Sequence, residues 1–258
     1  DAQRSRAVHF EVLGPEDARG REPGLAASLR GAFSFPRDGV ARAGRVGRAL
    51  VLAARAAGVR VREGVHVRAV ARAVGRVTGV ETSAGFLPSE VVVLAGAAGP
   101  DGVEGAPRLS LEPTSRPWLR LEAGSDPDRP GRLLVSREVS LVPRRDGTLL
   151  VLGRGSREAV PAGPSAGSVA ELLSSVARMV PAAPGWVLRD LGAGVDFAAP
   201  DGVPVLGEAG EGGLLVAAGW GGDDLLFCPA AAALLADLVM GRTPPLGASP
   251  FSPGRIGV

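Results

Sequence analysis

This chain of 258 residues contains no lysine, no asparagine and no tyrosine, and it has one glutamine and one isoleucine. Arginine, alanine, glycine, valine and proline are abundant instead, which is typical of a gene rich in G and C. All 29 basic side chains are therefore arginines, which do not titrate below about pH 12. The isoelectric point near 9.7 follows from this chemistry more than from the net charge of +2, so it does not indicate an acidic partner.

Other absences exclude whole classes of protein. The single cysteine, Cys228, excludes an internal disulfide and fits a reducing compartment. No apolar run approaches the roughly 18 residues that span a bilayer, and no signal peptide is recognisable, so we expect a cytoplasmic protein without a membrane partner. The arginines are scattered and are not interleaved with aromatic residues, so we expect no nucleic-acid partner.

Common metal-binding and dinucleotide-binding motifs are also lacking. His9 and His66 are far apart and no cysteine pair accompanies them, so we expect no metal site. The segments that begin at Gly153 and Gly192 both lack the third glycine of the G-x-G-x-x-G motif, and neither opens a predicted helix.

The residues that are present predict a folded protein, because 45% hydrophobic content can supply a sizeable core. Apolar residues recur at helical spacing in residues 45–58, so we expect a helix with one buried face there. That face comprises Val46, Leu50, Ala53 and Ala57. A second amphipathic helix is predicted over residues 168–180, with Ser165 or Ser168 as its N-cap and an end before Pro181.

Strand patterns complete a mixed α/β chain. Residues 59–85 alternate apolar and polar side chains and predict two or three short strands. Residues 91–94 are continuously apolar, as in a parallel strand covered on both faces. Asp146-Gly147 predicts a hairpin turn, and residues 199–219 predict two strands before a final helix. The order of these elements indicates an antiparallel lobe inserted between pieces of an α/β lobe.

Two stretches read together resemble a known family. PDGVPVLG begins at Pro200, and GLLVAAGWGGDDLLFCPAAAALLADLVMG begins at Gly213 and leads to PFSPGR. Upstream, LVPRRDGTLLVLG, VVVLAGAAG and LRGAFSFPRDG continue the likeness in the same order, so that it covers residues 15–255. Together these motifs resemble the D-amino-acid oxidase family, and most closely the bacterial glycine oxidases of thiamin biosynthesis.

The resemblance implies an FAD-dependent oxidoreductase with two lobes. Residues 36–100 and 196–258 would form the FAD-binding Rossmann-type lobe, and residues 1–35 and 101–195 the antiparallel substrate lobe. Val67 and Ala95-Gly96 would contact the adenosine side of FAD. The remaining flavin-lining residues implied by the family are Asp201, Gly202, Gly219, Trp220, Gly221, Gly222, Asp223, Asp224 and Leu225.

The physics of the last turn agrees with this implication. Glycines let the backbone approach a flat ring, and we expect Pro229 to open the helix that follows. The N-terminus of a helix carries unpaired N–H groups and a partial positive charge. Such an end suits the anionic N1/C2=O edge of a reduced flavin.

Three departures from the family pattern concern function. The family's first strand and its G-x-G-x-x-G turn have no counterpart here, so the first βα unit is supplied by a second chain, or lies outside this sequence, or FAD is not bound in the family way. Asp196 stands where the family has an arginine that pairs with the substrate carboxylate, which favours a small amine substrate of neutral or cationic character. Ser140 replaces the family's tyrosine, and Trp220 and Asp223 replace its histidine and asparagine. Asp196, Ser140 and Trp220 are the predicted substrate-pocket residues.

These observations leave several functions open. The first is oxidation of an amine by hydride transfer to flavin, which depends on placing the donor carbon over the ring more than on an acid or base residue. The second is a non-catalytic family remnant or partner subunit that binds a protein or a small ligand. The third is flavin binding without oxidation. No catalytic residue is assigned.

Overall fold

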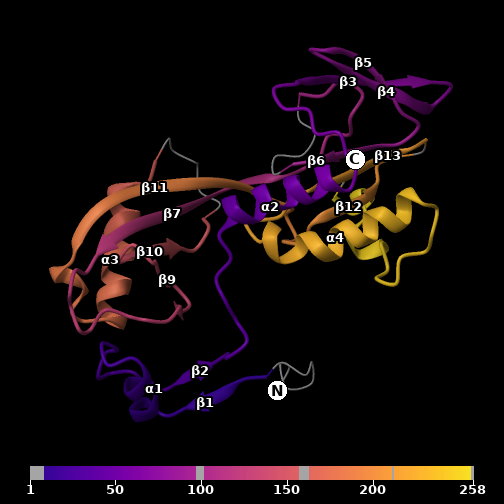
Figure 1. The fold of residues 1–258 in the computed structure, drawn as a ribbon. Helices are drawn as coiled ribbons and strands as arrows, with labels where there is room; N and C mark the ends of the chain where they lie inside the picture. Colours follow the sequence, from indigo (N-terminus) through magenta and orange to yellow (C-terminus); the bar gives the residue numbers. More distant parts are fainter. Residues whose placement is uncertain (1–8, 97–101, 157–162, 211, 257–258) are drawn as a thin grey trace. The chain divides into compact units, whose positions relative to one another are not determined.

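The structure is a computed structural model that describes residues 9–96, 102–156, 163–210 and 212–256. The chain divides into two compact units, each built from separate stretches of sequence (Figure 1). The first unit comprises residues 1–42, 116–156 and 160–194, and the second comprises residues 43–115, 157–159 and 195–258. The architecture is mixed α/β, as expected from the order of the predicted elements.

The first unit is centred on a mainly antiparallel sheet with the strand order β11-β7-β10-β9-β8. One helix, α3 (Ala166–Met179), packs on this sheet, and a 3-10 turn, η2 (Ala183–Gly185), follows it. The strands are β7 (Glu112–Glu122), β8 (Leu134–Val135), β9 (Val139–Pro143), β10 (Thr148–Gly153) and β11 (Val187–Ala198). The core between sheet and helix includes Leu119, Leu141 and Val151, each 0% exposed.

Local signals in the sequence explain the ends of these elements. The β9–β10 hairpin turns where predicted, because Asp146 Oδ1 accepts hydrogen bonds from the backbone N–H and the hydroxyl of Thr148, at 3.1 and 2.7 Å. Helix α3 begins after Ser165, whose hydroxyl accepts the Ser168 N–H at 3.1 Å. The predicted helix, its N-cap and its end before Pro181 are thus confirmed.

A small N-terminal motif belongs to the same unit. It consists of β1 (Glu11–Leu13), α1 (Pro15–Arg21) and β2 (Ala32–Ser34), with the two strands antiparallel. Glu22 is 7% exposed and ties the motif to residues beyond β7. Its carboxylate accepts the Gly131 N–H at 3.0 Å and the Arg132 guanidinium at 3.1 Å.

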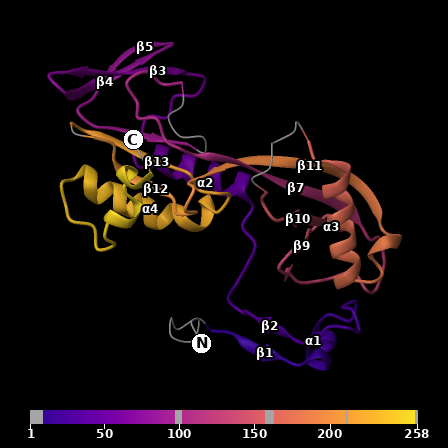
Figure 2. The same cartoon turned by 180° about the vertical axis from the view of Figure 1, so that it is seen from behind.

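The second unit contains a three-stranded sheet with the order β12-β13-β6. Its strands are β12 (Val205–Glu208), β13 (Leu214–Ala218) and β6 (Val92–Ala95). Helix α4 (Asp224–Val239) covers one face through Leu206, Ala217, Ala231 and Leu234, as seen from both sides (Figures 1 and 2). The 3-10 turns η3 (Ser249–Phe251) and η4 (Pro253–Ile256) follow α4.

A separate antiparallel sheet holds β3 (Val67–Ala73), β4 (Arg76–Thr82) and β5 (Gly85–Pro88). Two of these strands, β3 and β4, lie within residues 59–85, where two or three strands were predicted, and β5 begins at the last of those residues. The first strand begins only at Val67. Residues 59–66 alternate as a strand would and yet join no ladder in the described structure. A strand is assigned only where a neighbouring strand supplies hydrogen bonds, so a period-two pattern alone is insufficient.

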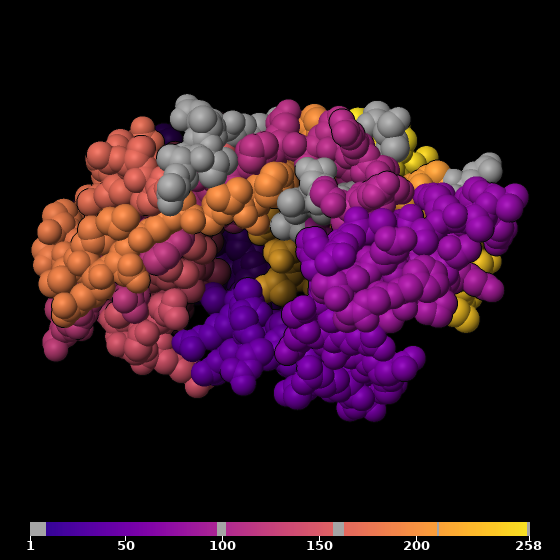
Figure 3. Space-filling view, turned by 90° about the horizontal axis from the view of Figure 1, so that it is seen from above, coloured from indigo at the N-terminus to yellow at the C-terminus, as the bar shows by residue number. Residues whose placement is uncertain are grey.

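Two predictions of burial are wrong for the second unit. Helix α2 (Ala43–Ala56) forms where expected, but none of its residues is buried, and Leu50 is 55% exposed. Strand β6 pairs in parallel with β13 as expected, but it is not covered on both faces, because Val93 is 40% exposed. The indigo-to-purple stretch that includes α2 reaches the surface in the space-filling view (Figure 3). The described residues thus leave these apolar groups without neighbours that would bury them.

Among the described residues, no helix has both the length and the apolar character needed to cross a bilayer. The longest apolar helix, α4, is interrupted by Asp237.

Candidate functional site

The carboxyl ends of β6 and β13 lie at the same edge of their sheet because the two strands run parallel. Ala95 is in register with Ala217, and the Gly96 N–H donates to the Ala217 carbonyl at 3.1 Å. The chain leaves β13 directly into Gly219. Ala95-Gly96 and the turn at Gly219 are therefore brought together, at the kind of edge where open α/β sheets bind ligands.

The turn at Gly219 needs a residue without a side chain. Gly219 has φ +72°, and a Cβ there would lie 2.9 Å from Leu111 Cδ2 and 3.3 Å from the Ala199 nitrogen. The Gly221 N–H then donates to the Phe197 carbonyl at 2.9 Å, and Trp220 forms an isolated bridge with Ala198. The turn is thus packed against the end of β11, and only glycine fits its first position.

Helix α4 starts earlier than the sequence suggested. It begins at Asp224, with Asp223 as an N-cap that makes no side-chain capping bond, so Pro229 lies inside the helix and does not open it. Proline has no N–H, and the carbonyl of Leu225 therefore loses its partner four residues on. The Cys228 thiol lies 3.7 Å from this carbonyl and donates to it instead. The helix N-terminus, with its partial positive charge, therefore adjoins the glycine turn directly.

Asp201 and Gly202 lie in a turn between β11 and β12. Asp201 Oδ1 accepts the Val203 N–H at 3.0 Å, and the Gly202 N–H donates to the Ala199 carbonyl at 2.9 Å. The Asp201 carboxylate also pairs with Arg255, with 2.7 Å between Oδ2 and Nε. Hydrogen bonds from the Arg255 side chain, and next from the Val203 N–H, lower the pKa of Asp201 to about 2.

Sequence reasoning missed Arg255. It lies 54 positions from Asp201, and no local pattern links two such residues. Its place after SPG near the C-terminus indicated only a family likeness. The ion pair became visible only when the fold placed η4 beside the turn at Asp201.

The other predicted site residues are distributed between the two units. Val67 opens β3 in the separate sheet of the second unit, where it is half-buried and paired with Thr82. Asp196 is half-buried near the end of β11, and its carbonyl accepts the Thr114 hydroxyl at 3.3 Å. Ser140 lies on β9 in the first unit, half-buried and opposite Leu152 of β10. The structure therefore groups Trp220, Ala95-Gly96 and the α4 start, while Ser140 belongs to the other unit.

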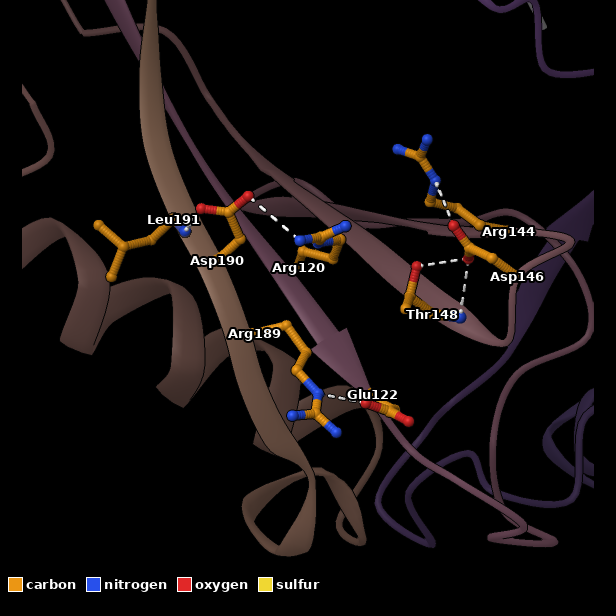
Figure 4. Close-up of polar contacts among 8 residues, drawn as sticks. All are labelled: Arg120, Glu122, Arg144, Asp146, Thr148, Arg189, Asp190 and Leu191. Atoms are coloured by element: carbon orange, nitrogen blue, oxygen red, sulfur yellow. Dashed lines mark hydrogen bonds and ion pairs between the residues drawn. The ribbon is translucent and has the colours of Figure 1, made fainter.

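Charged residues on the first unit's sheet neutralise one another. Arg120 of β7 pairs with Asp190 of β11 at 3.3 Å, and Glu122 pairs with Arg189 on the same two strands (Figure 4). The indole of Trp118, also on β7, lies so close to Gly192 that a Cβ there would be 2.6 Å from the ring. These contacts hold β11 beside β7 and leave no uncompensated acid in either pair.

No group of three or more histidine, cysteine, aspartate or glutamate side chains could hold a metal ion within the part of the chain that the structure describes. The site therefore consists of backbone groups, a helix end and a few charged side chains.

Comparison with known proteins places these features in context. Residues 1–238 match the DAO family, described as FAD dependent oxidoreductase. The bifunctional protein ThiO/ThiG of Synechocystis sp. is 31% identical over 94% of this chain and 37% of the relative's length. Glycine oxidase of Geobacillus kaustophilus is 31% identical over 92% of this chain and 64% of its own length.

Solved structures show the same fold. The crystal structure of glycine oxidase from Geobacillus kaustophilus aligns with a TM-score of 0.81 at 27% identity, over 98% of this chain and 69% of that chain. L-proline dehydrogenase from P. horikoshii aligns with a TM-score of 0.83 at 19% identity, over 98% of this chain and 70% of that chain, which is a likeness of fold. The chain thus spans about one third to two thirds of the length of the curated relatives it matches.

Proposed function

Because this chain belongs to the DAO family of FAD-dependent oxidoreductases, we propose that it forms the flavin-facing and substrate-facing part of an amine oxidase of the glycine oxidase type. The observation that carries the proposal is the juxtaposition of the Gly219 turn, Ala95-Gly96 and the start of α4 at one sheet edge. When bound, FAD supplies the acceptor for the hydride that leaves the carbon next to the amine nitrogen. The chain's own groups orient that ring and the amine.

The residues at this edge fit a flavin ring in two respects. The glycines at 219, 221 and 222 let a planar group lie against backbone, and the N-terminus of α4 offers backbone N–H groups that have no partner within the helix. The residues of this chain do not supply the usual binding turn for the FAD pyrophosphate, because no G-x-G-x-x-G motif occurs in the 258 residues. We propose that residues outside this sequence hold the pyrophosphate.

The open edge of β6 supports the proposal that residues outside this sequence complete the FAD site. β6 has β13 as its one strand neighbour among the described residues, and it lies at the end of the strand order. An edge strand presents unpaired N–H and C=O groups that can accept another strand. A neighbouring βα unit would also cover the exposed apolar side chains of α2. It would cover residues 59–66 as well, which alternate apolar and polar side chains but belong to no strand. Such a unit comes either from the rest of the same polypeptide or from a second chain.

Asp196 directs the choice of substrate. A carboxylate facing a substrate carboxylate at about 4 Å, with an effective dielectric of about 20, opposes binding by about 4 kcal/mol, whereas arginine would favour it by a similar amount. We therefore propose an amine without a neighbouring carboxylate as the substrate. Such an amine would lose a hydride from the carbon next to its nitrogen, for which bound FAD would be the acceptor, and a proton from the nitrogen, which would pass to solvent. Water would then hydrolyse the resulting imine to a carbonyl product and ammonia or an amine.

FAD content tests the proposal. The full product of the gene and the 258-residue chain would be purified separately, and released FAD would be measured per chain after desalting. We expect about one equivalent in the full product, together with hydrogen peroxide formation from an amine panel under air. A folded, colourless full product that gains no FAD on incubation would contradict the proposal.

Charge reversal tests the substrate class. Asp196→Arg should shift preference toward amino acids, raising their kcat/KM relative to simple amines by at least tenfold. Glu208→Arg makes the same change of charge at the last residue of β12, opposite Leu215, and should leave the preference unchanged. Equal effects of both substitutions on the substrate preference would show that Asp196 does not line the substrate pocket.

A second function is favoured by the same departures. The reversed charge at Asp196 and the serine at position 140 remove two family groups, as expected if the chain retains the fold without catalysis. In that case it serves as a partner subunit or binds a small ligand. Flavin bound without any amine turnover in the full product would support this non-catalytic reading.

A further inference from the structure

The guanidinium of Arg255 bonds to three different residues near the site. Its Nε lies 2.7 Å from Asp201 Oδ2, and its Nη2 lies 3.3 Å from Asp201 Oδ1. The same Nη2 donates to the Val203 carbonyl, and Nη1 donates to the Ser252 carbonyl at 3.2 Å. The Arg255 side chain is 18% exposed and the Asp201 side chain is 43% exposed, so the two-pronged pair is shielded on the arginine side and open to solvent on the carboxylate side.

Arg255 is itself anchored in the core of the second unit. The preceding Pro253 is buried, and the following Ile256 packs against the cluster that contains Val205 and Val216. The Arg255 N–H also donates to the Ser252 carbonyl at 3.2 Å. The backbone on both sides of Arg255 is therefore fixed, and the guanidinium restrains the carboxylate of Asp201.

The chain segment around Asp201 also contacts the turn at Gly219. Residue 199, at the start of the Asp201 turn, is 0% exposed, and its nitrogen is one of the atoms that a Cβ on Gly219 would approach, at 3.3 Å. Just before it, Ala198 bridges to Trp220, and the Phe197 carbonyl accepts the Gly221 N–H at 2.9 Å. Movement of the Asp201 turn would therefore disturb the hydrogen bond at Gly221.

We propose that Asp201 and Arg255 form a latch that positions the Gly219–Gly222 turn, acting through the backbone of residues 197–203. Asp201 thus acts as a positioning residue. The consequence for flavin placement rests on the proposed function, whereas the mechanical coupling between latch and turn does not. Because the pKa of Asp201 is lowered to about 2, the pair stays charged down to a lower pH than an aspartate with the ordinary value of 3.8 would allow.

Amide hydrogen exchange, followed residue by residue by NMR on the 258-residue chain, tests the coupling without any cofactor. Asp201→Asn and Arg255→Gln should each accelerate exchange of the Gly221 N–H at least tenfold, while the N–H of Leu121 in the other unit stays unchanged. Asp237→Asn is the matched control, because Asp237 makes a comparable ion pair with Arg242, at 3.7 Å, near the far end of α4. This control should leave Gly221 unchanged.

Two further variants separate the latch from general stability. Arg255→Lys keeps the charge and can make one bond to the carboxylate, so it should give an intermediate exchange rate at Gly221. The charge-swapped double variant Asp201→Arg with Arg255→Asp should recover at least part of the lost protection. Faster exchange at Gly202 with no change at Gly221 would overturn the latch, and so would equal acceleration throughout the unit.

Flavin retention distinguishes this inference from the proposed function. In the full product, Asp201→Asn should lower FAD affinity at least threefold and shift the flavin absorption band, whereas Asp237→Asn should do neither. If Gly221 responds as expected but the wild-type full product never binds FAD, the latch stands and the proposed function fails. If FAD binds and Asp201→Asn changes neither its affinity nor its spectrum, the positioning role is refuted.

Discussion

The two units bury their apolar side chains to very different extents. In the first unit, one face of the five-stranded sheet is covered by α3, and Leu119, Leu141 and Val151 are 0% exposed. In the second unit, α2 has no buried residue and β6 leaves Val93 40% exposed, although α2 has an apolar face and β6 is apolar throughout. The difference teaches that an apolar pattern indicates which face can be buried, whereas burial itself requires a neighbour.

The largest contrast concerns leucines in the two units. Leu119→Ala in the first unit should lower the free energy of unfolding by about 3 kcal/mol, because it removes buried methyl groups and leaves a cavity. Leu50→Ala on α2 should change it by less than about 0.5 kcal/mol, because that side chain is 55% exposed. Urea unfolding of the 258-residue chain measures both. A loss near 2 kcal/mol for Leu50→Ala would show that α2 is covered in solution, and the two units would then not differ in burial as described.

A smaller contrast concerns the helix N-termini. Ser165→Ala should destabilise the chain by about 1 kcal/mol, because the serine hydroxyl accepts the Ser168 N–H. Asp223→Ala should cost no more than a few tenths of a kcal/mol, because Asp223 makes no side-chain capping bond. Thermal unfolding followed by circular dichroism gives both values. Similar losses would mean that Asp223 caps α4 in solution.

The third contrast depends on pH. The folded-state pKa of Asp201 is depressed to about 2 from 3.8, so its ionised form stabilises the fold above about pH 4, and this contribution is lost as the pH falls toward 2. Asp201→Asn should therefore destabilise the chain at pH 7 and converge on the wild type as the pH approaches 2. Chemical unfolding at a series of pH values measures the difference. A penalty that is constant over this range would show that the carboxylate charge is not involved.

Some elements could be predicted because their signals are local. The Ser165 cap, the stop before Pro181 and the Asp146-Gly147 turn act within a few residues, and each lies where the sequence indicated. The parallel pairing of residues 91–94 was also predicted from composition. Pro229 was misplaced because a proline is tolerated within α4 when the Cys228 thiol bonds to the free carbonyl, and no sequence rule anticipates that compensation.

The candidate site was predictable only in part. The resemblance pointed to the Gly219 turn and to Ala95-Gly96, and the parallel register of β6 and β13 brings these together. Whether they contact a flavin stays a prediction, as do the roles of Asp196, Ser140 and Val67. The partner of Asp201 could not be predicted, because residues 54 positions apart meet only through the packing of everything between them.

By itself, the sequence determined the family, the mixed α/β class, the Ser165 helix cap and the Asp146-Gly147 turn, since these depend on neighbouring residues and on short motifs. Tertiary structure alone decided which apolar faces are covered, where β3 starts, and which guanidinium holds Asp201. The physical reason is that burial, strand pairing and long-range ion pairs are contacts between distant segments, so they exist only after the chain has brought those segments together.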